Sequence, residues 1–150
     1  MKKIKKLFKM RYLGIDLGSK TVGLAMSDTT LTIASTYKTI FFKDEDYNST
    51  INEIKDIIKE NNITKIILGL PKNMNNTLGE RAEITLKYKE LLEQSTDLPV
   101  IMFDERLTSV ISNSILIEAD ISRKKRKKKV DSIAAQIILQ DYLNKEKNNG

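Results

Sequence analysis

Alternating apolar and polar positions mark the first third of the chain and predict β-strands there. Residues 11–17 and 21–27 form two such runs on either side of a short connection that begins with Gly18, a residue that favours a tight turn. A third strand is expected over residues 33–42. Together the three strands predict an antiparallel meander.

Helical spacing and short apolar runs follow the meander. Recurring apolar positions and helix-start signals predict helices over residues 46–61, 77–94, 108–119 and 129–145. Thr77 and Glu80 have the spacing of a capping box, which would open the second of these helices. Residues 65–71 and 98–103 are continuous apolar runs, typical of buried parallel strands. This order predicts an α/β fold with a mixed five-stranded sheet, a three-strand antiparallel meander plus two parallel strands, flanked by helices.

The length of 150 residues fits one domain, which we place over residues 11–145. Residues 1–10 form a basic N-terminal tail, expected to be a solvated arm, and residues 146–150 a disordered C-terminal tail. No apolar run approaches the roughly 20 residues needed to span a bilayer, and the tail lacks the apolar stretch of a signal peptide. We therefore expect a cytoplasmic protein.

Two residue types are missing, and their absence narrows the chemistry. The chain has no cysteine and no histidine. Disulfides, thiolate and imidazole metal ligands, and catalytic triads with histidine are therefore excluded. Catalysis would have to use carboxylates, lysines, hydroxyls or a bound metal ion.

The net charge of +6 is concentrated in two segments. Residues 123–129 read RKKRKKK, and residues 1–10 hold five more lysines. Without these two segments, 14 basic residues remain against 20 acidic ones, so the body of the protein is acidic. Such basic runs commonly meet phosphate polymers or acidic membranes.

Asp16 lies within an otherwise apolar strand, where a buried carboxylate is costly. Alternation places it on the face opposite Leu13, Ile15 and Leu17, and its same-face neighbours Gly14 and Gly18 would leave space beside it. The alternative is a structural aspartate that hydrogen-bonds the hairpin turn.

Acidic residues also occur at the end of a predicted strand and in the last predicted helix. Asp104 and then Glu105 follow the apolar strand. The phase of that strand is undecided because residues 100–103 are all apolar. Either acid could face inward, or both could begin a solvated loop. Asp131 shares a predicted helix face with Ala134, Ala135, Ile138 and Tyr142. It could instead serve the helix dipole, although the lysines at 127–129 would oppose that dipole.

Three carboxylates on distant segments suit a site for hard cations. Mg²⁺ and Mn²⁺ take oxygen ligands, and two such ions about 4 Å apart can support phosphodiester cleavage. Bound cations would also relieve the mutual repulsion of clustered acids.

Four blocks of sequence resemble the YqgF/RuvX family: GIDLGSKTVGLAMSD, IILGLPKNMNNTLGERA, DERLTS and RKKRKKKVDSIAAQIILQDYL. They occur in the order typical of that family and cover about residues 11–143. The resemblance implies an RNase H-like fold and a two-metal nuclease of the kind described as a Holliday junction resolvase or as a nuclease that matures pre-16S ribosomal RNA. Residues 1–10 have no counterpart in this pattern.

The resemblance also implies roles for individual residues. It places the catalytic and metal-binding acids at Asp16, Glu105 and Asp131, with Asp104 as the less favoured choice beside Glu105. Hydroxyls typical of the family fall on Thr108 and Ser109. Nucleic-acid contacts are expected from Arg106, Thr108, Arg123, Lys124, Lys125, Arg126, Lys127, Lys128 and Lys129. Arg106 could instead pair with Asp104, and Arg81 and Lys20 could either reach phosphate or remain solvated surface residues.

Other functions stay open at this point. A non-catalytic nucleic-acid binder would use the basic run alone, with structural acids. An actin-like ATPase or sugar kinase shares the hairpin signature, but it needs several hundred residues to enclose a nucleotide. A membrane-surface patch lacks an amphipathic anchor. The sequence is compatible with precursor RNA or a four-way DNA junction as the substrate. It is also compatible with a monomer or a homodimer, although a junction nuclease would favour a two-fold dimer.

Overall fold

A five-stranded mixed sheet in the order β3-β2-β1-β4-β5 forms the centre of the protein. The computed structural model describes residues 10–43, 46–70, 79–104 and 123–149. Within these ranges, residues 104, 123–131 and 149 are described by their backbone alone. The strands are β1 (Arg11–Leu17), β2 (Thr21–Ser27), β3 (Ala34–Phe41), β4 (Ile63–Leu70) and β5 (Val100–Asp104). Strands β1, β2 and β3 form an antiparallel meander, while β4 and β5 run parallel to β1, which confirms the predicted topology.

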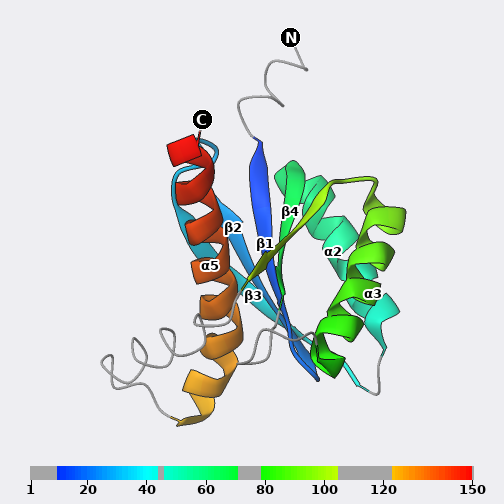
Figure 1. Ribbon diagram of the computed structural model, residues 1–150. Coiled ribbons are helices and arrows are strands. Elements are labelled where there is room, and N and C mark those ends of the chain that lie inside the picture. The colour runs from blue at the N-terminus through cyan, green and yellow to red at the C-terminus, as the bar shows by residue number, and fades with distance from the viewer. Residues whose placement is uncertain (1–9, 44–45, 71–78, 105–122, 150) are drawn as a thin grey trace.

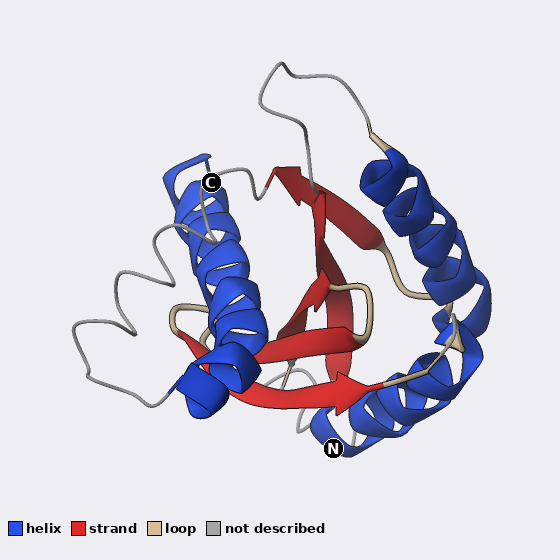
Figure 2. Ribbon diagram, turned by 90° about the horizontal axis from the view of Figure 1, so that it is seen from below, coloured by secondary structure: helices blue, strands red, loops and turns tan. Residues whose placement is uncertain are grey.

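Helices cover both faces of this sheet. Helices α2 (Tyr47–Asn61) and α3 (Glu80–Thr96) lie on one face, and α5 (Arg123–Asn149) lies on the other (Figure 1). The view along the sheet shows the same three layers (Figure 2). The helix predicted over residues 108–119 lies outside the described residues.

Two of the predicted helices have other boundaries in the structure. The N-cap of α3 is Gly79, with no side-chain cap hydrogen bond, so the helix begins later than the predicted residue 77, and Thr77 itself lies outside the described residues. Glu80 and Glu83 in its first turn provide the negative charge that suits a helix N-terminus. Helix α5 is longer than the predicted 129–145: it takes in the whole basic run and the last turn that the sequence pattern assigns to a C-terminal tail.

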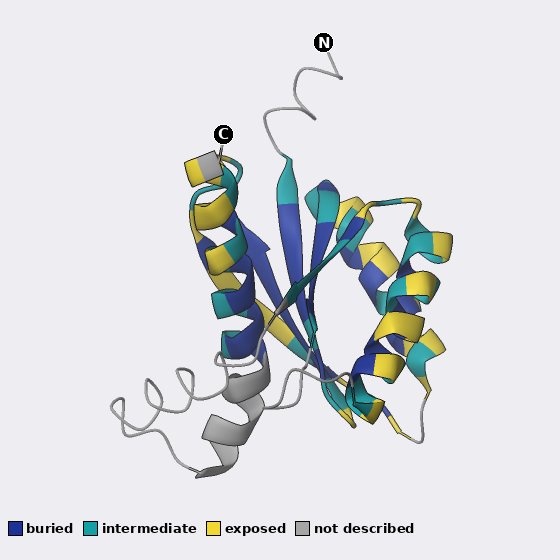
Figure 3. Cartoon of the chain, viewed as in Figure 1, coloured by how far each residue is buried: buried dark blue, intermediate teal, exposed yellow. Residues whose placement is uncertain are grey.

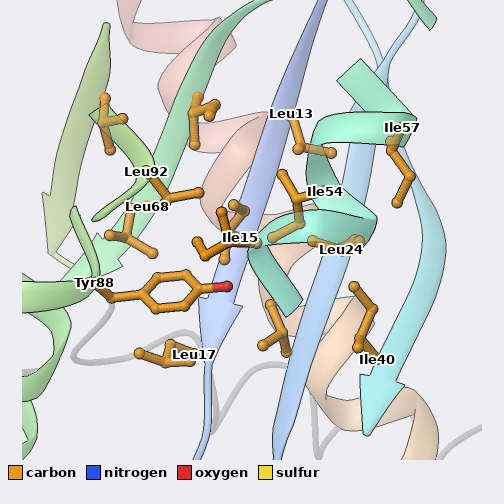
Figure 4. Packing of buried hydrophobic residues seen from close by; sticks show 14 of the residues in the cluster. Leu13, Ile15, Leu17, Leu24, Ile40, Ile54, Ile57, Leu68, Tyr88 and Leu92 are labelled. Atoms are coloured by element: carbon orange, nitrogen blue, oxygen red, sulfur yellow. The ribbon is translucent and has the colours of Figure 1, made fainter. Parts of the chain in front are cut away.

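The core between the sheet and α2/α3 is built from large aliphatic side chains. Figure 4 shows its centre, with Leu13 and Ile15 of β1 against Ile54 of α2 and Leu92 of α3. Tyr88 is also buried there, and its hydroxyl lies 2.7 Å from Thr50 Oγ1. Burial raises the pKa of Tyr88 and keeps this internal hydroxyl pair neutral.

The core under α5 uses smaller residues and a second kind of contact. Ala25, Ala34 and Ala135 are buried there with Leu139 and other side chains of the helix. The side chain of Gln140 accepts a hydrogen bond from Ala34 N at 2.8 Å and donates one to the Thr32 carbonyl at 2.9 Å. These bonds tie α5 to the backbone at the start of the edge strand β3. Most residues of β3 are exposed (Figure 3).

Candidate active site at the carboxyl end of β1

Asp16 lies on the α5 face of the sheet, near the carboxyl end of β1. Its neighbours Ile15 and Leu17 point into the core on the α2/α3 face, whereas Tyr12 belongs to the core under α5. Alternation along the strand therefore places Asp16 on the same side as Tyr12. The residue is half-buried, and groups at the carboxyl ends of parallel strands are the usual place for function in such sheets.

Helix α5 runs antiparallel to β1, so its N-terminal half reaches the Asp16 end. Near the start of the strand, the Tyr12 hydroxyl donates a hydrogen bond to Glu146 Oε1 at 3.1 Å. Two residues further on, a Cβ on Gly14 would lie 2.8 Å from Leu139 Cβ and 2.9 Å from the Ala135 carbonyl oxygen.

The next step of the same register leads to the beginning of the helix. Two strand residues advance about 6.6 Å, which corresponds to roughly four residues of helix. Because Gly14 faces the turn between Ala135 and Leu139, this step places Asp16 opposite the preceding turn of α5, between residues 131 and 135. The side chain of Asp131 lies outside the described part of the structure.

Gly14 has a different role from the one expected. The sequence predicts that it leaves space beside the Asp16 carboxylate, but the backbone and Leu139 side chain of α5 fill that space. The glycine therefore allows close approach of the helix that carries Asp131.

The phase of β5, undecided from the sequence, is resolved as far as Phe103. Ile101 and Phe103 pack on the α5 side, whereas Met102 packs against the opposite core. Ile15, Leu68 and Met102 form one row across β1, β4 and β5. Phe103 is therefore in the row that follows, level with Asp16 and on the same face. Glu105, Arg106, Thr108 and Ser109 lie outside the described residues.

Arg81 reaches this end of the sheet from the other side. Its Nη2 donates a hydrogen bond of 3.1 Å to the carbonyl oxygen of Leu17, the residue after Asp16. From the sequence, Arg81 could contact phosphate or remain a solvated surface residue. The structure gives it a third role. It links the first turn of α3 to the end of β1.

The basic run occupies the first two turns of α5. The backbone of Arg123–Lys129 is helical, and the direction of α5 brings this run to the same end of the molecule as Asp16 (Figure 1). The described residues give no positions for its side chains. No helix in the described part of the chain is long and apolar enough to cross a membrane.

A cluster at the opposite end of α5 was not predicted. Lys65 Nζ of β4 lies 3.1 Å from both Glu146 Oε2 and the Tyr142 hydroxyl, and 4.8 Å from the centre of the Tyr12 ring. Burial lowers the pKa of Lys65, but its hydrogen bonds to Tyr142 and Glu146 outweigh this effect and raise it. A lysine inside an apolar strand was the available signal, and the cluster anchors the C-terminal end of α5.

The donors available at this site suit a hard divalent cation. The chain has neither histidine nor cysteine, and Asp16 offers half-buried carboxylate oxygens where β1 ends. Among the residues that the structure describes, no group of three acidic side chains lies close enough to hold a metal ion. Of the three predicted ligands, however, only Asp16 has a described side chain.

Comparison with known proteins gives a consistent result along nearly the whole chain. Residues 10–145 match the profile of a family described as RuvX: Holliday junction resolvase. A "Putative pre-16S rRNA nuclease" of Oceanobacillus iheyensis is 46% identical over 137 residues, which cover 91% of this chain and 100% of the relative. A protein of the same name from Clostridium acetobutylicum is 47% identical, with 90% of this chain and 98% of the relative covered.

Two solved structures share the fold at low sequence identity. RuvC of Thermus thermophilus, solved in complex with a Holliday junction substrate, superimposes with a TM-score of 0.60 at 12% identity, over 93% of this chain and 96% of that one. The Holliday junction resolvase of fowlpox virus gives 0.55 at 16% identity, over 91% and 99%. These likenesses confirm the RNase H-like arrangement of sheet and helices. By its sequence and its fold, this chain belongs to the RuvX family and is a nuclease, a hydrolase of phosphodiester bonds.

Proposed function

We propose that the protein is a Mg²⁺- or Mn²⁺-dependent endonuclease whose metal ligands are Asp16, Glu105 and Asp131. The observation that carries this proposal is the position of Asp16, half-buried on the α5 face at the carboxyl end of β1. A structural aspartate serving the hairpin turn would be expected within the turn rather than inside the strand before it.

The register of α5 supports the second ligand. Close packing of Gly14 against Ala135 and Leu139 sets the helix against β1, and the step from there leads to the turn that begins at residue 131 and lies opposite Asp16. A role for Asp131 only in the helix dipole is weakened because α5 begins at Arg123, two turns earlier.

The phase of β5 supports Glu105 over Asp104 as the third ligand. Ile101 and Phe103 occupy the α5 face, and the next residue in this alternation is Glu105. Asp104 is out of phase with them.

Carboxylates in this arrangement would hold the divalent ions that hydrolysis of a phosphodiester requires. When bound, two divalent ions would activate a water molecule and stabilise the leaving oxygen of the phosphodiester. The chain itself supplies oxygen ligands held on rigid elements: a central strand, the end of a second strand and a helix. Arg81 holds the end of β1 through Leu17 and so fixes the backbone beside Asp16.

Phosphate contacts would come from the basic run and from the segment after β5. We assign nucleic-acid binding to Arg106, Thr108, Arg123, Lys124, Lys125, Arg126, Lys127, Lys128 and Lys129. The N-terminal turns of α5 lie at the Asp16 end of the molecule, so cations there would meet the same strand that is cleaved.

For the substrate, we favour a precursor of 16S ribosomal RNA. Relatives that are 46% and 47% identical over nearly their full length carry the name of such a nuclease. A four-way DNA junction is the second candidate, because the description of the family names it.

One experiment tests the proposal and separates the two substrates. Purified protein with Mn²⁺ is incubated with an end-labelled precursor RNA fragment and, separately, with a four-way DNA junction, alongside the Asp16→Asn variant. We expect metal-dependent cleavage by the wild type and none by the variant. Cleavage by Asp16→Asn, or binding without cleavage by the wild type, would contradict the proposal; the second outcome would indicate a nucleic-acid binder without catalysis.

A further inference from the structure

Phe41, the last residue of β3, is an exposed aromatic side chain on the α5 face of the sheet. Its side chain is 59% exposed, while its neighbours Ile40 and Phe42 are buried in the core on the α2/α3 face. Alternation therefore places Phe41 on the side that also carries Asp16.

Strand pairing brings Phe41 to the same end of the sheet as Asp16. Asp16 pairs with Gly23, and Gly23 pairs with Thr39, so these three residues form one row across β1, β2 and β3. Phe41 pairs with Thr21 in the next row on this face, further toward the carboxyl end of β1. With strands about 4.8 Å apart, Phe41 lies roughly 12 Å from Asp16 along the sheet surface.

The chain near Phe41 is polar and includes two lysines as well as the acidic residues 44–46. Lys20 and Lys43 are both exposed, and the Lys20 carbonyl accepts a hydrogen bond of 3.0 Å from Phe42 N, which holds the hairpin turn against the end of β3. Thr21 and Thr39 contribute hydroxyls to the surface between Phe41 and Asp16. An aromatic ring with lysines close by is typical of surfaces that bind single-stranded nucleic acid.

We propose that Phe41 is a stacking platform for an unpaired nucleobase of the substrate, a few nucleotides from the phosphodiester that is cleaved. This inference rests on the proposed function, because Asp16 defines where cleavage occurs. The occupant is a single-stranded segment rather than a second copy of the chain. A stable protein interface needs a wide apolar area, whereas the residues next to Phe41 on this face are Thr21 and Thr39, with the exposed Tyr37 beyond Thr39.

The test measures binding to strands with and without bases. In the Asp16→Asn background, Phe41→Ala, Phe41→Trp and Ile33→Ala are titrated with a fluorescein-labelled oligouridylate and with a strand of equal length made of abasic ribose units. Ile33 is a matched control, since its side chain is 60% exposed at the opposite end of β3.

We expect Phe41→Ala to weaken binding of the oligouridylate about tenfold, as for loss of one stacked base, and to leave the abasic strand unaffected. Phe41→Trp should keep the wild-type affinity, and Ile33→Ala should change neither strand. Equal loss on both strands, or no loss on either, would overturn the proposal. So would a change of oligomeric mass on Phe41→Ala, which would assign the residue to an interface between copies.

The outcome is independent of the test of the proposed function. Loss of base-dependent binding in Phe41→Ala supports the stacking role whether or not Asp16→Asn abolishes cleavage. A wild type that cleaves with Mn²⁺ while Phe41→Ala binds the oligouridylate normally would refute the stacking role alone.

Discussion

Arg81 donates a hydrogen bond of 3.1 Å to the carbonyl oxygen of Leu17 and thereby joins the first turn of α3 to the last residue of β1. Leu17 follows Asp16 directly in the chain. The guanidinium therefore holds the piece of backbone from which the proposed metal ligand projects.

Replacing Arg81 by alanine should weaken both the fold and catalysis. A hydrogen bond from a charged donor to a partly buried carbonyl contributes on the order of 1.5 kcal/mol, so urea unfolding should show a loss of about this size. The rate of single-turnover cleavage should also fall, because the end of β1 gains freedom. Lys89→Ala is the control on the same helix: its ion pair with Glu93 is partly exposed and should contribute less than about 0.5 kcal/mol. Equal stability of the two variants would contradict the account.

Gly14→Ala should displace α5 from the sheet. The added Cβ would meet Leu139 Cβ at 2.8 Å and the Ala135 carbonyl oxygen at 2.9 Å, and both atoms are fixed by the helix backbone. We expect a loss of about 1–3 kcal/mol in the free energy of unfolding, the range typical of overpacking. Gly18→Ala is the milder comparison, because its Cβ would meet the Thr21 hydroxyl at 3.0 Å and the Thr21 carbonyl oxygen at 3.2 Å, both less close than the contacts at Gly14. A Gly14→Ala variant as stable as Gly18→Ala would show that α5 is not held closely there.

The cluster around Lys65 predicts how stability depends on pH. Burial would raise the pKa of Glu146, but hydrogen bonds from Tyr142 and Lys65 lower it below the ordinary 4.5. Its contribution is therefore present above pH 4.5 and lost as the pH falls through the lowered pKa. The pKa of Lys65 is raised above 10.5, so its contribution is present below that pH and lost as the pH rises through the raised value.

Glu146→Gln should accordingly cost stability at neutral pH and little in acid. The side chains of Glu146 and Lys65 are both partly exposed, so we expect the free energy of unfolding to fall by roughly 0.5–1 kcal/mol at pH 7. Thermal unfolding of the two proteins across the acid range would measure it. The difference between them should shrink as Glu146 of the wild type becomes protonated. A constant difference at every pH would show that the carboxylate charge does not matter.

Much of the fold could be predicted because its signals are local. Alternation around Gly18 and the apolar runs of β4 and β5 predict strands whatever their surroundings, and the chain order then limits how they pair. Contacts between distant segments have no such signal. The role of Gly14 depends on Leu139 of α5, and the role of Arg81 depends on a backbone carbonyl of β1.

The candidate site was predictable in its chemistry and less so in its geometry. An aspartate inside an apolar strand and the absence of histidine already favour oxygen ligands for a metal. The choice between Asp104 and Glu105 required the phase of β5, which four consecutive apolar residues conceal. The packing of Ile101 and Phe103 under α5 gives this phase as far as residue 103, and Glu105 as a ligand stays a prediction.

Neutralising part of the basic run should reduce the salt dependence of nucleic-acid binding. We expect the Lys127→Gln, Lys128→Gln double variant to lower the slope of log K against log salt by about 0.7 for each phosphate of a single strand that these lysines neutralise in the wild type. The control is Lys55→Gln with Lys59→Gln, which removes the same charge from exposed positions of α2, on the opposite face of the sheet. Binding measured by fluorescence anisotropy between low and moderate salt would distinguish them. Identical slopes for the two double variants would show that the basic run does not contact the phosphates of the nucleic acid.

The convergence of Asp16 and Asp131 on one metal ion is the claim on which the mechanism depends. Isothermal calorimetry with Mn²⁺ tests it on the wild type, Asp16→Asn, Asp131→Asn and the variant with both changes. Asp141→Asn, at an exposed position further along α5, serves as the control. We expect each single change to weaken binding at least about tenfold, the double change to add little, and Asp141→Asn to bind as the wild type does. Wild-type Mn²⁺ affinity in Asp131→Asn would contradict the account.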